Sequence, residues 1–201
     1  MAIKTTKEII DYLIKQDTCF QSLYDKFGLI EYGDEGTVFE SIVFTIVGQM
    51  LSNKAASTIY GRIAAVLKDI TPVTMLQADT DALRRCGSSY AKIKYIKNFA
   101  SMWVNHELDF DSLAYKTDQE VITYLTRIDG IGLWTAEMIT LFTLGRQNIF
   151  SFNDIALRSG ILIAHPEYKS LTKHRFEMLR KKYSPYCSYA SLYFYKLRDS
   201  K

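Results

Sequence analysis

The sequence predicts an all-α protein built as two helical lobes, and three observations support this fold class. Apolar residues recur at helical spacing through most of the 201 residues, whereas alternating runs typical of strands are few. Only three prolines and ten glycines interrupt the chain. Threonine or serine stands repeatedly before the apolar stretches, often with glutamate three residues later, which is the pattern of a helix capping box.

The N-terminal region is expected to form two helices. Thr5 and Glu8 fit a capping box that opens the first helix, and apolar residues at helical spacing continue the second until Gly28. The polar, glycine-containing segment 31–36 then predicts a boundary between lobes.

Residue 37 opens the central part of the chain. Thr37 and Glu40 form a further capping box, and the helix after them is apolar nearly all round, so it should be buried centrally. Ser52 is expected to cap the next helix, and Thr71 with Pro72 marks a turn. The later helices are expected over residues 81–86, 90–104 (capped by Ser88 or Ser89), 117–128, 133–144, 155–165, 172–183 and from Pro185, at the N1 position, to the end.

This order of elements predicts how the two lobes divide the chain. Residues 37–152 form a central helical bundle, and residues 1–36 together with 153–201 form the second lobe.

Composition is ordinary for a soluble globular protein, with 48% hydrophobic and 23% charged residues. The net charge of +3 permits nucleic-acid binding without demanding it. Three scattered cysteines predict reduced thiols, and three isolated histidines argue against a clustered metal site. The N-terminus lacks the apolar core of a signal peptide, and no apolar run reaches membrane-spanning length. We therefore expect a cytoplasmic monomer with no membrane partner.

The most informative stretch is residues 125–157. The helix opened by Thr117 and Glu120 stops at the two glycines of residues 129–132, which allow a tight turn and a close approach by another backbone. A second helix follows and ends at Gly145. Backbone amides at Gly130 and Gly132 would then lie at a helix N-terminus, which favours a phosphate.

The segment IDGIGLWTAEMI (128–139), followed by SFNDIALR (151–158), resembles the signature of the helix–hairpin–helix (HhH-GPD) superfamily of DNA glycosylases. The similarity runs from about residue 37 to 197 and is greatest to the 3-methyladenine (alkylpurine) DNA glycosylase II family. This resemblance implies a two-lobed helical fold with its active site in the interlobe cleft. It also implies base excision repair, in which an alkylated purine is flipped out of double-stranded DNA and its N-glycosidic bond is hydrolysed. If the protein is bacterial, it should be associated with the nucleoid.

The resemblance places the essential carboxylate of the family on Asp154. A carboxylate suits this chemistry, because it stabilises an oxocarbenium-like sugar and can orient or deprotonate the attacking water. The ordinary alternative is a helix N-cap, a role for which aspartate is among the favoured residues, and the two roles are compatible. Many relatives carry two acidic residues here, whereas this chain has Asn153 first.

Trp134 stands where strand-cleaving relatives carry the lysine that forms a Schiff base with the sugar. The resemblance therefore implies a monofunctional glycosylase without lyase activity. The ordinary alternative is a buried core aromatic. In the functional interpretation, the indole stacks on the flipped base, and a cationic alkylated purine gains a cation–π contact of about 0.5–2 kcal/mol. The predicted base pocket consists of Trp134, Tyr195 and Met138, and the family usually has tryptophan at the position of Tyr195.

The expected DNA contacts lie at two places. The first is the hairpin, with Gly130, Ile131, Gly132 and Thr135. The second is the break between two helices at Gln49 and Met50, where similar glycosylases carry a wedge that fills the gap left by the flipped nucleotide, although a plain loop is an equal alternative.

No organic cofactor is expected. As in relatives, the backbone carbonyls of Thr126, Ile128 and Ile131 are candidate ligands for a structural Na⁺ or K⁺ at the hairpin.

Two alternatives to an alkylpurine glycosylase stay open. One is a glycosylase of the same fold that acts on deaminated or oxidised bases. The other is a non-catalytic HhH protein that binds damaged DNA. The sequence lacks the cysteine cluster of relatives that hold an iron–sulfur cluster.

Overall fold

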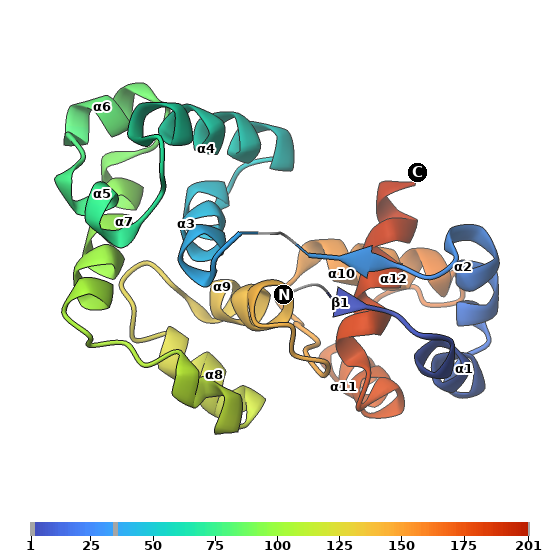
Figure 1. Cartoon of the computed structure of the whole chain (residues 1–201). Coiled ribbons are helices and arrows are strands. Elements are labelled where there is room, and N and C mark those ends of the chain that lie inside the picture. Colours follow the sequence, from blue (N-terminus) through green and yellow to red (C-terminus); the bar gives the residue numbers. More distant parts are fainter. Residues whose placement is uncertain (1–2, 34–35, 201) are drawn as a thin grey trace. The chain divides into compact units, whose positions relative to one another are not determined.

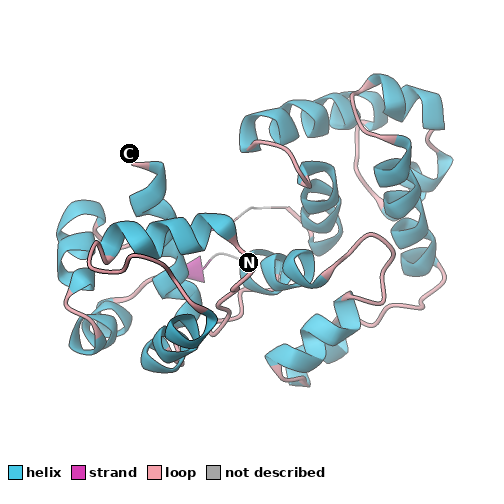
Figure 2. Ribbon diagram, turned by 180° about the vertical axis from the view of Figure 1, so that it is seen from behind, coloured by secondary structure: helices cyan, strands magenta, loops and turns pink. Residues whose placement is uncertain are grey.

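The computed structural model describes residues 3–33 and 36–200. Within these residues the chain forms twelve α-helices, short 3₁₀ and π segments, and one small antiparallel sheet (Figures 1 and 2). The predicted all-α class is therefore confirmed. None of the described helices has the length and apolar character needed to cross a membrane.

The chain divides into two compact units. The first contains Met1–Glu35 and Thr140–Lys201, and the second contains Gly36–Ile139. The sequence predicted this second boundary after residue 152. Residues before 152 join the first unit because they bond to the start of the last helix, where the Ser188 amide donates to the Gln147 carbonyl at 2.9 Å and the Ile149 amide donates to the Ser188 hydroxyl at 2.9 Å.

The second unit begins with the helix that was expected to be central. The side chains of Thr37 and Glu40 form the predicted capping box, Ser52 and Ser89 cap their helices as expected, and Thr117 forms a box with Glu120. The helices of this unit are α3 (Val38–Gly48), α4 (Asn53–Leu67), α5 (Pro72–Gln77), α6 (Thr80–Arg85), α7 (Tyr90–Val104), a 3₁₀ turn (Asp111–Tyr115), α8 (Asp118–Leu125) and α9 (Leu133–Met138).

One element of the second unit differs from the prediction. Thr71 and Pro72 do not merely turn the chain; they begin helix α5, with Thr71 as N-cap and Pro72 at the first helical position. Proline is well suited there, because the amide hydrogen it lacks would have no partner within the helix.

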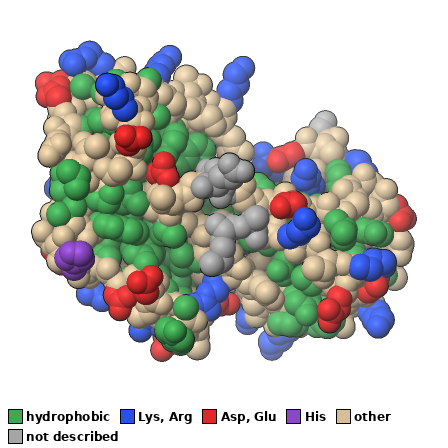
Figure 3. Space-filling view, viewed as in Figure 1, with side chains coloured by type: hydrophobic (Ala, Val, Ile, Leu, Met, Phe, Trp, Pro, Cys, Tyr) green, Lys and Arg blue, Asp and Glu red, His purple; other side chains and the backbone are tan. Residues whose placement is uncertain are grey.

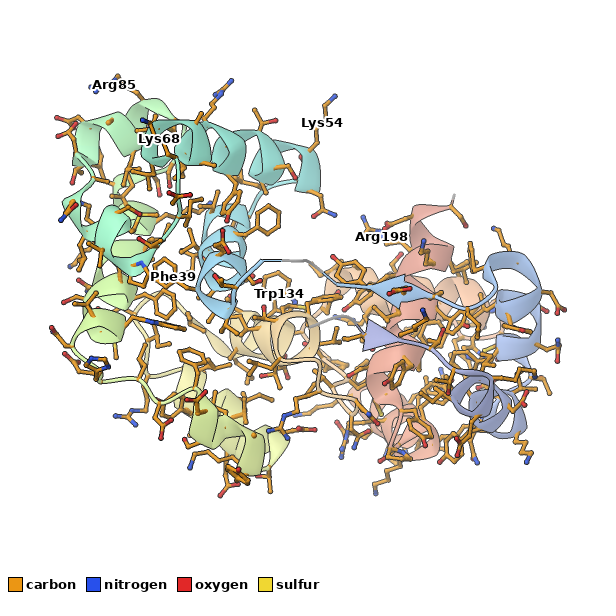
Figure 4. The ribbon with its side chains drawn as sticks, viewed as in Figure 1. Phe39, Lys54, Lys68, Arg85, Trp134 and Arg198 are labelled. Carbon is orange, nitrogen blue, oxygen red and sulfur yellow. The ribbon has the colours of Figure 1, made fainter. Side chains whose placement is uncertain are left out.

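The core of the second unit is built on α3 and α7. Phe39 is 3% exposed, and its ring stacks on Phe99 with centroids 5.0 Å apart, while Trp103 packs edge-on against both rings (Figure 4 labels Phe39). Helix α7 also packs against α5 and α6. In Figure 3, hydrophobic surface occupies the middle of this unit, and Lys and Arg side chains gather along its edge at α4 and α6.

The first unit contains both ends of the chain. Its elements are β1 (Ile3–Lys4), α1 (Lys7–Gln16), α2 (Cys19–Phe27), β2 (Glu31–Tyr32), α10 (Ile155–Ala164), α11 (Lys173–Tyr183) and α12 (Cys187–Asp199). Strands β1 and β2 pair in antiparallel fashion, Ile3 opposite Tyr32.

Several predicted helix ends differ from those of the described residues. Helix α1 is capped by Thr6, because the hydroxyl of Thr5 is instead buried against the Ile30 carbonyl at 3.0 Å. The last helix begins at Cys187, after the N-cap Tyr186, and not at Pro185. The helix expected to run to residue 144 ends as α9 at Met138 and continues as a π-helical segment, Ile139–Thr143.

Helices α10 and α12 cross at very short distance. A Cβ atom on Gly160 would lie 2.2 Å from the Phe194 carbonyl oxygen, so only glycine permits this crossing. The close packing fixes the start of α10 relative to the residue that follows Phe194, which is Tyr195.

A buried carboxylate joins the helical hairpin α1–α2 to the C-terminal helices. Asp17 accepts hydrogen bonds from Lys182 at 2.9 Å, Tyr183 at 2.8 Å and the Cys19 amide at 3.2 Å. The sequence predicted isolated histidines, but His165 lies 3.6 Å from the same carboxylate and 3.7 Å from the Cys19 thiol. Burial alone would raise the pKa of Asp17, but the hydrogen bonds outweigh it and lower that pKa.

Because the pKa of Asp17 is lower in the folded state, its contribution to stability is present at neutral pH and lost as the pH falls below about 4. Asp17→Asn should therefore lower the free energy of unfolding by about 2 kcal/mol at pH 7 and by much less at pH 3. Urea unfolding of both proteins across this range measures the difference. A difference that is independent of pH would contradict the ionic role of this carboxylate.

Candidate functional site

Asp154 is a buried carboxylate held at the first turn of α10. It is 4% exposed, and its Oδ1 accepts a hydrogen bond from the Leu157 amide at 2.8 Å, so Asp154 is the N-cap of the helix. Its Oδ2 accepts a hydrogen bond from the Tyr195 hydroxyl at 3.1 Å. The two predicted residues of the first unit are thus in direct contact, and the carboxylate is held at both oxygens.

An aromatic cluster of Tyr32, Phe142 and Tyr195 lies beside this carboxylate. The ring centroids of Tyr32 and Phe142 are 4.6 Å apart, and those of Phe142 and Tyr195 are 6.0 Å apart. Tyr32 is 49% exposed, and the other two rings are half-buried. Such rings offer flat, electron-rich faces on which a nucleobase can stack.

Sequence reasoning missed Tyr32 and Phe142. Tyr32 lies in the segment interpreted as a polar linker, and Phe142 lies in a continuous apolar run that indicated only a buried helix. An aromatic residue in an otherwise polar segment was the one available signal for Tyr32. The sequence contained no signal for Phe142, which lies in the π-helical segment, a feature that often marks functional sites.

The hairpin between α8 and α9 needs its first glycine for two reasons. Gly130 has a positive φ of 83°, and a Cβ atom there would lie 2.3 Å from Cδ2 of Tyr95. The turn is closed by the Ile131 amide, which donates to the Ile128 carbonyl at 3.0 Å. Asn98 on α7 also donates to Asp129 at 3.0 Å.

Gly132, the second glycine of the hairpin, is not required by the packing of the protein. It is the N-cap residue of α9, it supplies no side-chain cap, and a Cβ atom there would meet nothing within 4 Å. The protein therefore has no steric need for glycine at this position. An exposed helix start without a capping side chain leaves room for an anion, which the helix dipole favours.

This contrast yields a paired prediction. Gly130→Ala should destabilise the fold by about 1–2 kcal/mol or more, because alanine is strained at positive φ and Tyr95 must move. Gly132→Ala should cost less than about 1 kcal/mol of stability but weaken binding to a duplex with an abasic site about tenfold. Thermal unfolding and fluorescence anisotropy measure the two effects. The contrast fails if Gly132→Ala binds DNA like the wild type, or if Gly130→Ala unfolds at the wild-type temperature.

The turn after α3 presents one side chain outward and uses another inside. Met50 is fully exposed (100%) at a positive φ of 59°. The side-chain amide of Gln49 instead donates to the Gly130 carbonyl at 2.8 Å and to the Thr135 hydroxyl at 3.3 Å. Of the two residues predicted for the wedge, Met50 is the one whose side chain stands in solvent.

The remaining predicted residues lie on α9 or in the hairpin. Trp134 is 39% exposed at the first turn of α9 (labelled in Figure 4), so it is not a fully buried core residue. Met138, Thr135 and Ile131 are 7%, 5% and 3% exposed. The Ile128 carbonyl, a predicted cation ligand, accepts the hydrogen bond from the Ile131 amide described above.

Comparison with known proteins gives a consistent result. The family model described as HhH-GPD superfamily base excision DNA repair protein matches residues 43–185. The sequence is 30% identical over 139 residues to DNA-3-methyladenine glycosylase 1 of Schizosaccharomyces pombe, an alignment that covers 67% of this chain and 61% of that protein. The aligned part thus spans less than two thirds of the yeast protein.

Two solved structures are similar over nearly the whole chain. A DNA-3-methyladenine glycosidase from Bacillus halodurans has a TM-score of 0.82 and 31% identity, and the match covers 98% of this chain and 92% of that one. The 3-methyladenine DNA glycosylase Mag1 of S. pombe, in complex with abasic DNA, has a TM-score of 0.82 and 25% identity, with coverage of 94% and 96%.

Proposed function

Because this chain belongs to the HhH-GPD superfamily of base excision DNA repair proteins, we propose that it is a DNA glycosylase that removes alkylated purines of the 3-methyladenine type. The single observation that carries the proposal is the carboxylate of Asp154, held by the Leu157 amide and the Tyr195 hydroxyl beside an aromatic cluster. The names of the similar glycosylases support the substrate class.

The proposed reaction begins with DNA binding. The backbone amides of Gly130 and Gly132, at the start of α9, bind phosphates of the damaged strand, since this helix N-terminus has no capping side chain. The alkylated nucleotide is flipped out, and Met50 enters the gap that it leaves in the duplex. A thioether side chain suits this role because it is apolar and flexible.

Hydrolysis then depends on Asp154. As the N-glycosidic bond breaks, positive charge develops on the sugar, and the fixed carboxylate stabilises it and orients the attacking water. The products are the free base and an abasic site. In the first unit, Tyr195 is a proposed contact of the base, with Tyr32 and Phe142 added from the aromatic cluster. In the second unit, Trp134 and Met138 are the proposed contacts of the base.

We also propose that the enzyme does not cut the DNA strand. The side chain at position 134 is an indole and not an amine, so it forms no Schiff base with the sugar. A Na⁺ or K⁺ ion held by the carbonyls of Thr126, Ile128 and Ile131 is a further proposal for the hairpin, where it would add positive charge toward a phosphate.

The function is tested by incubating the protein with duplexes that contain N-methylated purines, uracil, hypoxanthine or 8-oxoguanine. Released bases are separated by chromatography, and strands are analysed with and without alkali. We expect release of the methylated purines and strand breaks only after alkali. Release of a deaminated or oxidised base alone would assign another lesion, tight binding without release would indicate a non-catalytic protein, and breaks without alkali would contradict the absence of lyase activity.

A further inference from the structure

Lys92 lies on helix α7, and its ammonium is partly buried within the second unit. Its Nζ donates to the Val47 carbonyl at 2.8 Å and to the Gln49 carbonyl at 2.6 Å. These carbonyls lie at the end of α3, where backbone acceptors lack partners within the helix and a positive charge is favoured by the helix dipole. Two of the three donors of Lys92 are therefore used to hold the turn that carries Met50.

The same helix also holds the hairpin. Tyr95 packs against Gly130, and Asn98 donates to Asp129. The side chain of Gln49 completes the connection, because it donates to the Gly130 carbonyl and links the turn directly to the hairpin. Helix α7, the turn at residues 48–51 and the hairpin thus each contact the other two, all within one compact unit.

The turn needs such support. Met50 has the left-handed backbone conformation, which costs about 1 kcal/mol or more for a residue with a side chain, and its own side chain makes no buried contact that could repay this strain. Within the turn, the Leu51 amide donates to the Gly48 carbonyl at 3.0 Å and the Gln49 amide to the Ile46 carbonyl at 3.3 Å, but both bonds are local. Burial lowers the pKa of Lys92, which is consistent with an ammonium partly withdrawn from water.

We propose that Lys92 is a positioning residue for base flipping: its ammonium fixes the turn at residues 48–51, so that Met50 stands at a set place relative to the phosphate-binding hairpin. The inference rests on the proposed function for the role of Met50. It assigns Lys92 to the geometry of the protein and not to DNA contact. Lys94, which is exposed on the same helix, provides the matched control.

The first test needs no catalytic activity. Hydrogen–deuterium exchange is measured at the amides of Gln49 and Leu51 in the wild type, Lys92→Met and Lys94→Met. We expect exchange about tenfold faster in Lys92→Met only, because two hydrogen bonds to the turn are lost. Unchanged exchange in Lys92→Met would overturn the inference.

The second test separates a positioning role from general destabilisation. Base release is compared on a duplex with a paired methylated purine and on one in which the lesion lies opposite a gap and flips readily. Lys92→Met should lower the rate of base release about tenfold more on the paired substrate than on the unpaired one. Lys92→Arg should restore the wild-type ratio of the two rates. In a Met50→Ala background, Lys92→Met should cause no further loss of rate.

The outcomes are distinguishable. An equal loss on both substrates, or additive effects of Lys92→Met and Met50→Ala, would overturn the positioning role although the enzyme is active. If the wild type releases no base from either duplex, the proposed function fails, and the exchange experiment still decides whether Lys92 holds the turn.

Discussion

Asp154→Asn is expected to reduce the rate constant for base release about 10³-fold, the size of effect typical for loss of one fixed group that stabilises transition-state charge. The substitution removes the negative charge and keeps the shape. Asparagine is as good an N-cap as aspartate, so α10 and the contact with Tyr195 should persist. Single-turnover kinetics on a methylated duplex measure the loss, and anisotropy with abasic-site DNA checks that binding is kept.

The neighbouring Asn153 offers the matched control for this experiment. Asn153→Ala alters a polar side chain beside Asp154 without touching the carboxylate, and it should change the rate less than tenfold. If Asp154→Asn retains wild-type activity, the carboxylate is only a helix cap and the proposed mechanism is wrong. If Asp154→Asn fails to bind DNA as well, its effect lies in the fold and not in the chemical step.

Trp134→Ala is expected to lower kcat/KM for a cationic alkylated purine about 10- to 100-fold. Stacking of a base on an aromatic ring contributes about 1–3 kcal/mol, and a cation–π contact adds to it. Because Trp134 is 39% exposed, its removal should leave the core of the second unit largely intact. The measurement compares a cationic lesion with a neutral one, since only the cationic base gains from the charge of the ring face.

Leu133 supplies the control for this substitution, because it is 48% exposed at the same turn of α9. Leu133→Ala should change kcat/KM far less, and Trp134→Phe should recover part of the loss. Equal losses for cationic and neutral bases would show that the indole contributes stacking or packing alone. A wild-type rate in Trp134→Ala would remove Trp134 from the base pocket.

The sequence was most reliable where a local rule decides the structure. The capping boxes at Thr37 and Thr117 formed as predicted, because the hydroxyl and the glutamate three residues later satisfy amides within one turn. The hairpin glycine at residue 130 was likewise readable, since positive φ is a property of a single residue. The resemblance then supplied the proposed role of Asp154.

Contacts between residues far apart in the sequence could not be predicted. Gly160 looked like any glycine in a helix until its contact with the Phe194 backbone was visible. Nothing near Lys92 in the sequence indicates that its ammonium reaches the end of α3. The hydrogen bond between Tyr195 and Asp154 joins residues 41 positions apart, and only the crossing of α10 and α12 brings them together.

If the proposed function holds, that hydrogen bond has a consequence for how undamaged bases are rejected. Tyr195 belongs to the aromatic cluster and also donates to Asp154 at 3.1 Å, so in the proposed reaction one side chain would contribute to both base recognition and hydrolysis. A base that fits poorly and displaces the ring by even one ångström would break this bond and loosen the carboxylate. Undamaged purines would therefore be rejected twice, once on binding and again in the rate of cleavage. The difference between undamaged and alkylated purines would then appear in kcat as well as in KM.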